Sequence, residues 1–164
     1  MYKIKLLILL LISYSFLSRT KSTYQQQGKS LSIGYIEGGF EGIMLRDTLE
    51  SYLMAAKHYS SHSNLEIKSE INHSDSIFIT NIDNTSDRQR ISSTLTTVIY
   101  DKLNDCDVYN NSAKVSQFYV FAPNDKFISN NTALQKIKRN NTDELVKLFI
   151  NDMQNEKLKC KDHE

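Results

Sequence analysis

The sequence predicts an α+β two-layer sandwich, with two helices packed on one face of a mainly antiparallel four-stranded sheet, in the order β-α-β-β-β-α. Two segments carry apolar residues at helical spacing, and one lies near each end of the predicted domain. A short strand-like segment precedes the first of them. Three further strand-like segments lie between the two helices, where they can pair antiparallel with one another.

The first half of the domain begins with a strand and a helix. Residues 31–35 alternate apolar and small side chains, which predicts a short strand. A glycine-rich break at 38–42 ends it, and residues 43–57 then carry apolar side chains at helical spacing. The Ser/His-rich stretch 58–64 is predicted to be a loop, and residues 65–79 a second strand.

A polar turn at 83–89 leads into a third strand, whose β-branched content favours a strand over a helix. Four apolar side chains are predicted to share one face of this strand: Ile91, Leu95, Ile99 and Leu103. Residues 105–107 predict a hairpin turn, and residues 108–122 a fourth strand. A turn that begins at Pro123 is expected to end that strand.

The second helix is predicted to run from about 131 to about 153. Asn141 falls on its apolar stripe, so the helix is expected to be bent or unevenly buried there. The single α+β domain is therefore predicted to span 31–154, with a linker at 23–30 before it and a charged tail at 155–164 after it.

Composition excludes several classes of protein. The chain has 164 residues, with 20 Lys and Arg against 19 Asp and Glu, and a net charge of +1. This balance argues against a strongly basic nucleic-acid-binding protein. A hydrophobic fraction of 40% argues against a disordered acidic chain and is enough for the core of one domain.

The N-terminus predicts export. Lys3 and Lys5 precede an apolar run at 6–17, which as a helix would be about 18 Å long. That length is well short of the roughly 30 Å of a membrane's hydrocarbon core. A basic segment followed by a short apolar run is typical of a signal peptide, so residues 1–22 are interpreted as a signal peptide or, alternatively, as an uncleaved anchor.

The residue patterns predict no catalytic site, metal or cofactor, and hence no enzyme. His58 and His62 lack the glutamate of a zinc-protease motif and lie in a polar loop. The acidic neighbours of Cys106 would raise the pKa of its thiol, the reverse of what a nucleophile needs. Cys106 and Cys160 can form one disulfide in an oxidising compartment, and two unpaired thiols are the alternative.

Two blocks of the sequence resemble the LPS-assembly lipoprotein LptE family. They are residues 42–49, which open the first helix with Gly-Ile-Met-Leu-Arg-Asp-Thr-Leu, and the late block 115–150, and the resemblance covers about residues 31–151. It implies a non-enzymatic protein on the periplasmic side of the outer membrane that plugs an LptD β-barrel translocon and helps to deliver lipopolysaccharide to the outer leaflet. Arg19 stands where the family has its acylated cysteine.

The resemblance also implies that Arg88 or Arg90 contacts lipid A phosphates, because family members bind lipopolysaccharide through basic residues at the sheet edge and the loop 84–90 occupies the corresponding position before the long strand. Guanidinium groups suit phosphate, although ordinary solvated charges are the plainer interpretation of the two arginines. The alternative function is a secreted α+β interaction module of an envelope or secretion system, or a secreted glycoprotein, without a role in lipopolysaccharide transport. Five Asn-x-Ser/Thr sites could carry glycans: Asn72, Asn84, Asn110, Asn130 and Asn140.

Overall fold

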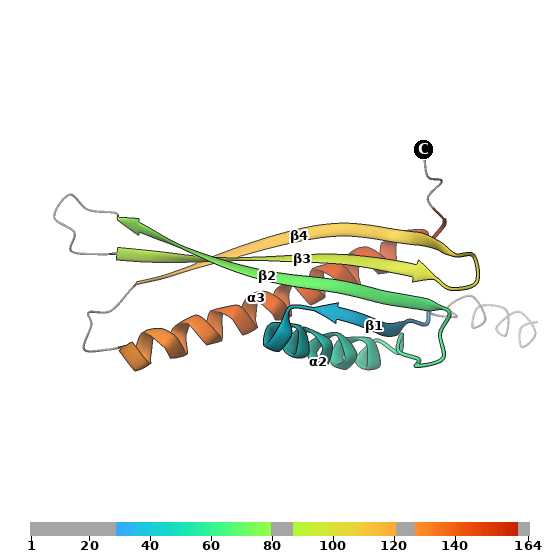
Figure 1. Ribbon diagram of the computed structural model, residues 1–164, viewed down its shortest axis with the longest axis horizontal. Coiled ribbons are helices and arrows are strands. Elements are labelled where there is room, and N and C mark those ends of the chain that lie inside the picture. Colours follow the sequence, from blue (N-terminus) through green and yellow to red (C-terminus); the bar gives the residue numbers. More distant parts are fainter. Residues whose placement is uncertain (1–28, 80–86, 121–126, 161–164) are drawn as a thin grey trace, which may run out of the picture.

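A computed structural model describes residues 29–79, 87–120 and 127–160, which form two layers, with both helices on one face of a sheet (Figure 1). The elements are β1 (Ser32–Glu37), α2 (Gly39–Ala55), β2 (Leu65–Ile79), β3 (Asp87–Asp101), β4 (Cys106–Val120) and α3 (Phe127–Asn155). The predicted fold class and element order are therefore confirmed.

The sheet has the strand order β1-β2-β3-β4. β1 is parallel to β2, while β2, β3 and β4 pair antiparallel with their neighbours. The β2–β3 ladder runs without a register shift from Leu65 opposite Asp101 to Ile79 opposite Asp87. The predicted mainly antiparallel sheet is confirmed, and its three long strands are all 15 residues in length.

The predicted hairpin turn at 105–107 is wrong, because the turn between β3 and β4 lies at 102–105 and Cys106 is already the first residue of β4. The Asp101 carboxylate accepts hydrogen bonds from the backbone N–H groups of Leu103 (2.9 Å) and Asn104 (3.4 Å), which starts the turn earlier. Leu103 therefore lies in the turn with 74% of its surface exposed, and not on the inward face of β3.

Both helices begin four residues earlier than the apolar spacing predicts. Gly38 has a φ of 124°, which turns the chain sharply from β1 into α2. Gly42 then lies against β1, since a Cβ atom there would be 2.9 Å from the carbonyl oxygen of Glu37. The turn predicted at Pro123, the segment 1–22 and the glycan site at Asn84 lie outside the described residues.

The hydrophobic core lies between the two layers. α2 contributes Leu45, Leu49 and Leu53, the sheet contributes Ile67, Ile71, Leu95 and Ile99, and α3 contributes Leu145, Val146, Phe149, Ile150 and Met153. All of α2 and β1 lies toward one end of the long strands, where the turn 102–105 also lies (Figure 1). We call this the proximal end, and the end near residues 79, 87 and 120 the distal end.

The proximal end is closed by two further links. The Nζ of Lys29 donates to the backbone carbonyl oxygens of Met153 (2.8 Å) and Glu156, at the carboxyl end of α3. Cys106 and Cys160 form a disulfide that joins the start of β4 to the segment after α3. Within the described part of the chain, neither helix combines the length and the apolar character that crossing a membrane requires.

Candidate functional site

The two faces of the sheet differ in composition. The odd-numbered residues of β3 from Ile91 to Ile99 are buried against the helices. The even-numbered residues of β3 lie on the opposite face, which no element among the described residues covers (Figure 1). We call this opposite face the outer face.

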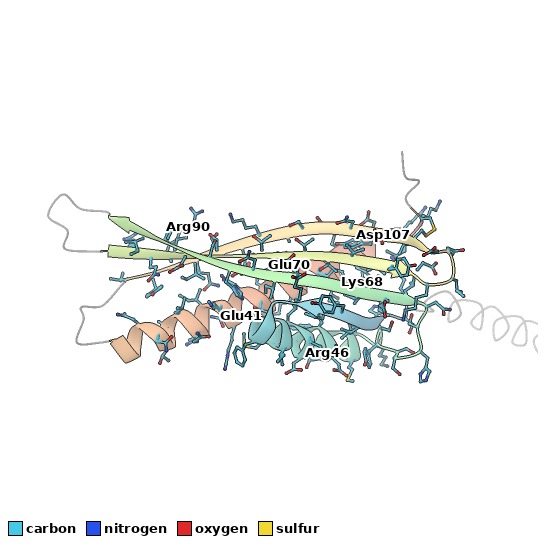
Figure 2. The ribbon with its side chains drawn as sticks, viewed as in Figure 1. Glu41, Arg46, Lys68, Glu70, Arg90 and Asp107 are labelled. Atoms are coloured by element: carbon cyan, nitrogen blue, oxygen red, sulfur yellow. A yellow bond between two sulfur atoms is a disulfide. The ribbon has the colours of Figure 1, made fainter. Side chains whose placement is uncertain are left out.

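On the proximal half of the outer face, both lysines have partners. The Nζ of Lys102 lies 2.9 Å from the Glu66 carboxylate, and the Nζ of Lys68 lies 4.1 Å from the centre of the Tyr100 ring. Figure 2 shows Lys68 and Glu70 on this half of the sheet. Cations and carboxylates thus alternate there, and their charges compensate one another.

The distal half of the outer face brings Arg88 and Arg90 together with apolar side chains of β4. In the β3–β4 register, Arg90 lies opposite Phe118, and Arg88 lies opposite Val120. Phe118 is 57% exposed and Val120 is 65% exposed, while Arg88 is also exposed. Two guanidinium groups therefore share one face with two exposed apolar side chains.

Short polar side chains hold one of these arginines. The Nε of Arg90 donates to the Oγ of Ser92 (3.3 Å), which in turn lies 2.8 Å from the Oγ of Ser116. Arg90 is half-buried and extends from the sheet on the side away from α3 (Figure 2). The guanidinium is thus positioned before any ligand binds, which lowers the entropy cost of a further contact.

The distal half of the outer face has a uniform sign of charge. Lys114, exposed on β4 opposite Thr94, adds a third cation to the two arginines. Beyond Glu70, the described side chains of the outer face include no carboxylate. Such a surface attracts anions, and its apolar neighbours suit a ligand that also carries hydrocarbon.

On the opposite face, a polar cluster that the sequence did not predict joins the sheet to α3. The Ser93 hydroxyl lies 2.7 Å from Nδ1 of His73 and accepts a hydrogen bond from Nδ2 of Asn141 (2.8 Å). Asn141, expected to disturb the burial of α3, is instead fully buried by this contact. The position of the polar Asn141 on the apolar stripe of the helix is the sequence signal that could have indicated this cluster.

Charged residues of both helices surround His73. The Nζ of Lys138 on α3 donates to Glu41 on α2 across 3.0 Å, and this contact lowers the pKa of the Glu41 carboxyl. Burial of His73, assisted by the charge of Lys138, lowers the pKa of the imidazole. The lowered pKa favours the neutral form of His73, which together with Ser93 and Asn141 links the sheet to α3.

The other residues singled out from the sequence lie apart from these clusters. His58 lies 3.3 Å from Gln154, His62 contacts Ser61, and the described residues contain no group of three or more His, Cys, Asp or Glu side chains that could hold a metal ion. Of the described glycan sites, Asn72, Asn110 and Asn140 are exposed, whereas Asn130 is 7% exposed.

Solved structures share this fold, although no family model and no curated protein matches the sequence. A minor lipoprotein from Acinetobacter baumannii matches with a TM-score of 0.58 and 16% identity, over 77% of this chain and 90% of that one. A lipoprotein from Caulobacter crescentus CB15 matches with a TM-score of 0.55 and 18% identity, over 77% and 88%.

Rare lipoprotein B from Shewanella oneidensis matches with a TM-score of 0.58 and 9% identity, over 76% of this chain and 91% of that one. At these identities the matches establish a common fold. The chain has the fold of bacterial lipoproteins over nearly the whole length of each of them.

Proposed function

We propose that this chain is an exported, non-enzymatic assembly factor of the outer membrane, which lies within an LptD-like β-barrel translocon on the periplasmic side and helps to deliver lipopolysaccharide to the outer leaflet. Three observations support the proposal. They are the sequence resemblance to LptE, the fold shared with bacterial lipoproteins, and the distal half of the outer face.

The distal outer face carries the lipid part of the proposal. Arg88 and Arg90 offer guanidinium forks that can bind phosphate oxygens in a bidentate manner. Phe118 and Val120, directly opposite them, offer apolar surface to the hydrocarbon beside a phosphorylated headgroup. Lipid A combines these two chemistries, so we assign its phosphates to the arginines and the adjoining acyl chains to the β4 side chains.

The rest of the outer face suits a barrel lumen. Short hydroxyl and amide side chains are exposed on the outer face of the long strands, such as Asn72 and Ser74 on β2 and Ser112 on β4. The interior walls of large β-barrels are polar, so such side chains can exchange hydrogen bonds with them. This arrangement requires no cofactor.

The test of the lipid contact is an Arg88→Ala/Arg90→Ala double variant. Its affinity for lipopolysaccharide should fall by about tenfold or more, because each charge-assisted hydrogen bond contributes about 1.5–3 kcal/mol. The matched control is Lys68→Ala/Lys102→Ala, which removes the same charge from the proximal half of the same face. An equal loss of affinity in both double variants would show that lipopolysaccharide responds only to the net charge of the face. Unchanged affinity in Arg88→Ala/Arg90→Ala would show that these arginines do not bind lipopolysaccharide.

The barrel is tested separately by purifying the tagged full-length chain from detergent-solubilised membranes of its native host. An outer-membrane β-barrel in near-equal amount is the expected result. Its absence would favour the alternative, an envelope or secretion-system module without a role in lipopolysaccharide transport. Glycans at the exposed Asn72, Asn110 or Asn140 would favour a secreted glycoprotein instead.

A further inference from the structure

The edge of the sheet beside β2 is only half covered. β1 pairs with β2 from Glu66 to Glu70, and the chain then turns away at Gly38. A Cβ atom on Gly38 would lie 3.2 Å from the carbonyl oxygen of Ile71, so the turn falls where the pairing ends. Beyond this point, no described residue forms a strand on that side of β2, and we call residues 71–79 the open edge of β2.

The hydrogen-bonding direction along this edge follows from the register. The Lys102 N–H donates to the carbonyl oxygen of Asn64 (2.9 Å), and these two residues continue the β2–β3 register by one position. Hydrogen-bonded and non-hydrogen-bonded pairs alternate in an antiparallel ladder, so the even-numbered residues of β2 direct their backbone groups toward β3. The odd-numbered residues of the open edge, His73, Asp75 and Ile77, direct theirs away from β3.

Of the devices that protect an edge strand, the open edge of β2 carries only the charge of Asp75. Residues 71–79 contain no Lys, Arg or Pro, and their register with β3 has no bulge. The edge strand β4, by contrast, carries the exposed Lys114 at its centre and a register shift near Asp107. Ile77 is 68% exposed, so this weakly protected edge also offers an apolar side chain.

We propose that the open edge of β2 binds an extended segment of a partner polypeptide, which adds a fifth strand in line with β1. The outward N–H and C=O groups of His73, Asp75 and Ile77 form the ladder. Asp75 and Ile77 share a face, so the segment carries a cationic side chain opposite Asp75 and an apolar one near Ile77. The inference is independent of the proposed role in lipopolysaccharide delivery.

The charge of Asp75 argues for a different protein rather than a second copy of this chain. Asp75 is the central residue of the open edge, so symmetric antiparallel pairing of two such edges would place Asp75 opposite its own copy. Like charges directly opposite one another destabilise a ladder. A cation on a different chain removes that repulsion and also sets the register.

The test uses the full chain and a nine-residue peptide of alternating valine and threonine with one central lysine. Amide hydrogen exchange is measured by NMR, with the peptide at millimolar concentration. Without peptide, the amides of His73, Asp75 and Ile77 should exchange faster than those of Asn72, Ser74 and Ser76. With peptide, exchange at the three odd-numbered positions should slow by about tenfold, and the same peptide N-methylated at its four central amides should have no effect.

Two variants test the backbone and the charge separately. Ile77→Pro removes an edge N–H that makes no bond to β3, so it should weaken peptide binding by more than the matched control Ile77→Ala, which loses only the apolar contact of the side chain. Asp75→Lys should bind the lysine peptide more weakly and a peptide with a central glutamate more tightly. This charge exchange remains informative if the proline variant fails to fold.

Three outcomes would overturn the proposal. They are exchange that does not slow with peptide, equal binding of the N-methylated peptide, and protection of His73, Asp75 and Ile77 that rises with protein concentration alone. The last result would identify a second copy of this chain as the added strand. These experiments use only the protein and peptides, without lipopolysaccharide. A negative result would therefore rule out strand addition at the open edge of β2 without bearing on the proposed function.

Discussion

The proximal and distal halves of this molecule use the same three long strands but are completed differently. Proximally, α2 and β1 cover the sheet, a disulfide joins β4 to the segment after α3, and Lys102 on the outer face is paired with Glu66. Distally, α2 and β1 are absent, β2 has an open edge, and Arg88 and Arg90 lie beside exposed apolar side chains. The comparison indicates that the proximal half supplies most of the stability, while the distal half carries the surfaces that we propose bind partners.

Removing the disulfide at the proximal end should produce the largest change in stability. The bond closes a sequence separation of 54 residues, and its loss by Cys160→Ser should lower the free energy of unfolding by about 4 kcal/mol, mainly by releasing the unfolded chain. Urea denaturation of the oxidised protein and the variant measures this difference. Equal stability of the two would show that the proximal end does not depend on the covalent link.

A pair of truncations compares the two halves directly. Leu53→Ala in the proximal core should cost about 2–5 kcal/mol, because Leu53 is fully buried and its loss leaves a cavity. Ile77→Ala at the distal edge should change stability by less than about 0.5 kcal/mol, because Ile77 is 68% exposed. Urea unfolding of both variants measures the two losses of stability. Similar losses would contradict the inference that the proximal half supplies most of the stability.

The smallest predicted effect is a pH dependence at the boundary between the halves. The folded structure lowers the pKa of His73 below its usual 6.5, so the unfolded chain binds more protons as the pH falls through that value. Stability contributed by neutral His73 is therefore present above pH 6.5 and lost as the pH falls through the lower, folded pKa. Urea unfolding at a series of pH values from ~7.5 to ~5.5 should show this decline.

His73→Asn should flatten the decline, whereas the control His62→Asn, at an exposed loop residue, should retain it. The carboxyl of Glu41 does not interfere, because its own pKa lies below 4.5 and it loses its charge only at more acid pH. An unchanged slope in His73→Asn would assign the pH dependence to other groups.

The sequence predicted the elements well where local patterns determine them. The inward face of β3 at Ile91, Leu95 and Ile99 was correct because alternation along a strand is a local property. The start of α2 was missed because Gly42 packs against the backbone of β1, a tertiary contact that helical spacing does not encode. The hairpin turn was misplaced because the hydrogen bonds of the Asp101 carboxylate decide it, rather than the composition of 105–107.

The candidate site was predictable only in part. The sequence placed Arg88 and Arg90 in a loop before the third strand, whereas both lie in β3. They are two residues apart in that strand, so they share one of its faces. The neighbours Phe118, Val120 and Lys114 depend on the β3–β4 register, which a single sequence does not determine. The cluster of His73 with Ser93 and Asn141 was missed because it joins three elements that are distant in the chain.

The bond between Cys106 and Cys160 also determines how the domain transmits mechanical force. A tension applied between residues 29 and 160 passes from Cys160 directly to Cys106, so β4 and α3, which lie inside the closed loop, carry none of it. The tension instead acts on the chain from β1 to β3. An intact disulfide therefore limits the extension of a pulled molecule to the segment before Cys106, and its reduction adds the length of β4 and α3 to the stretch.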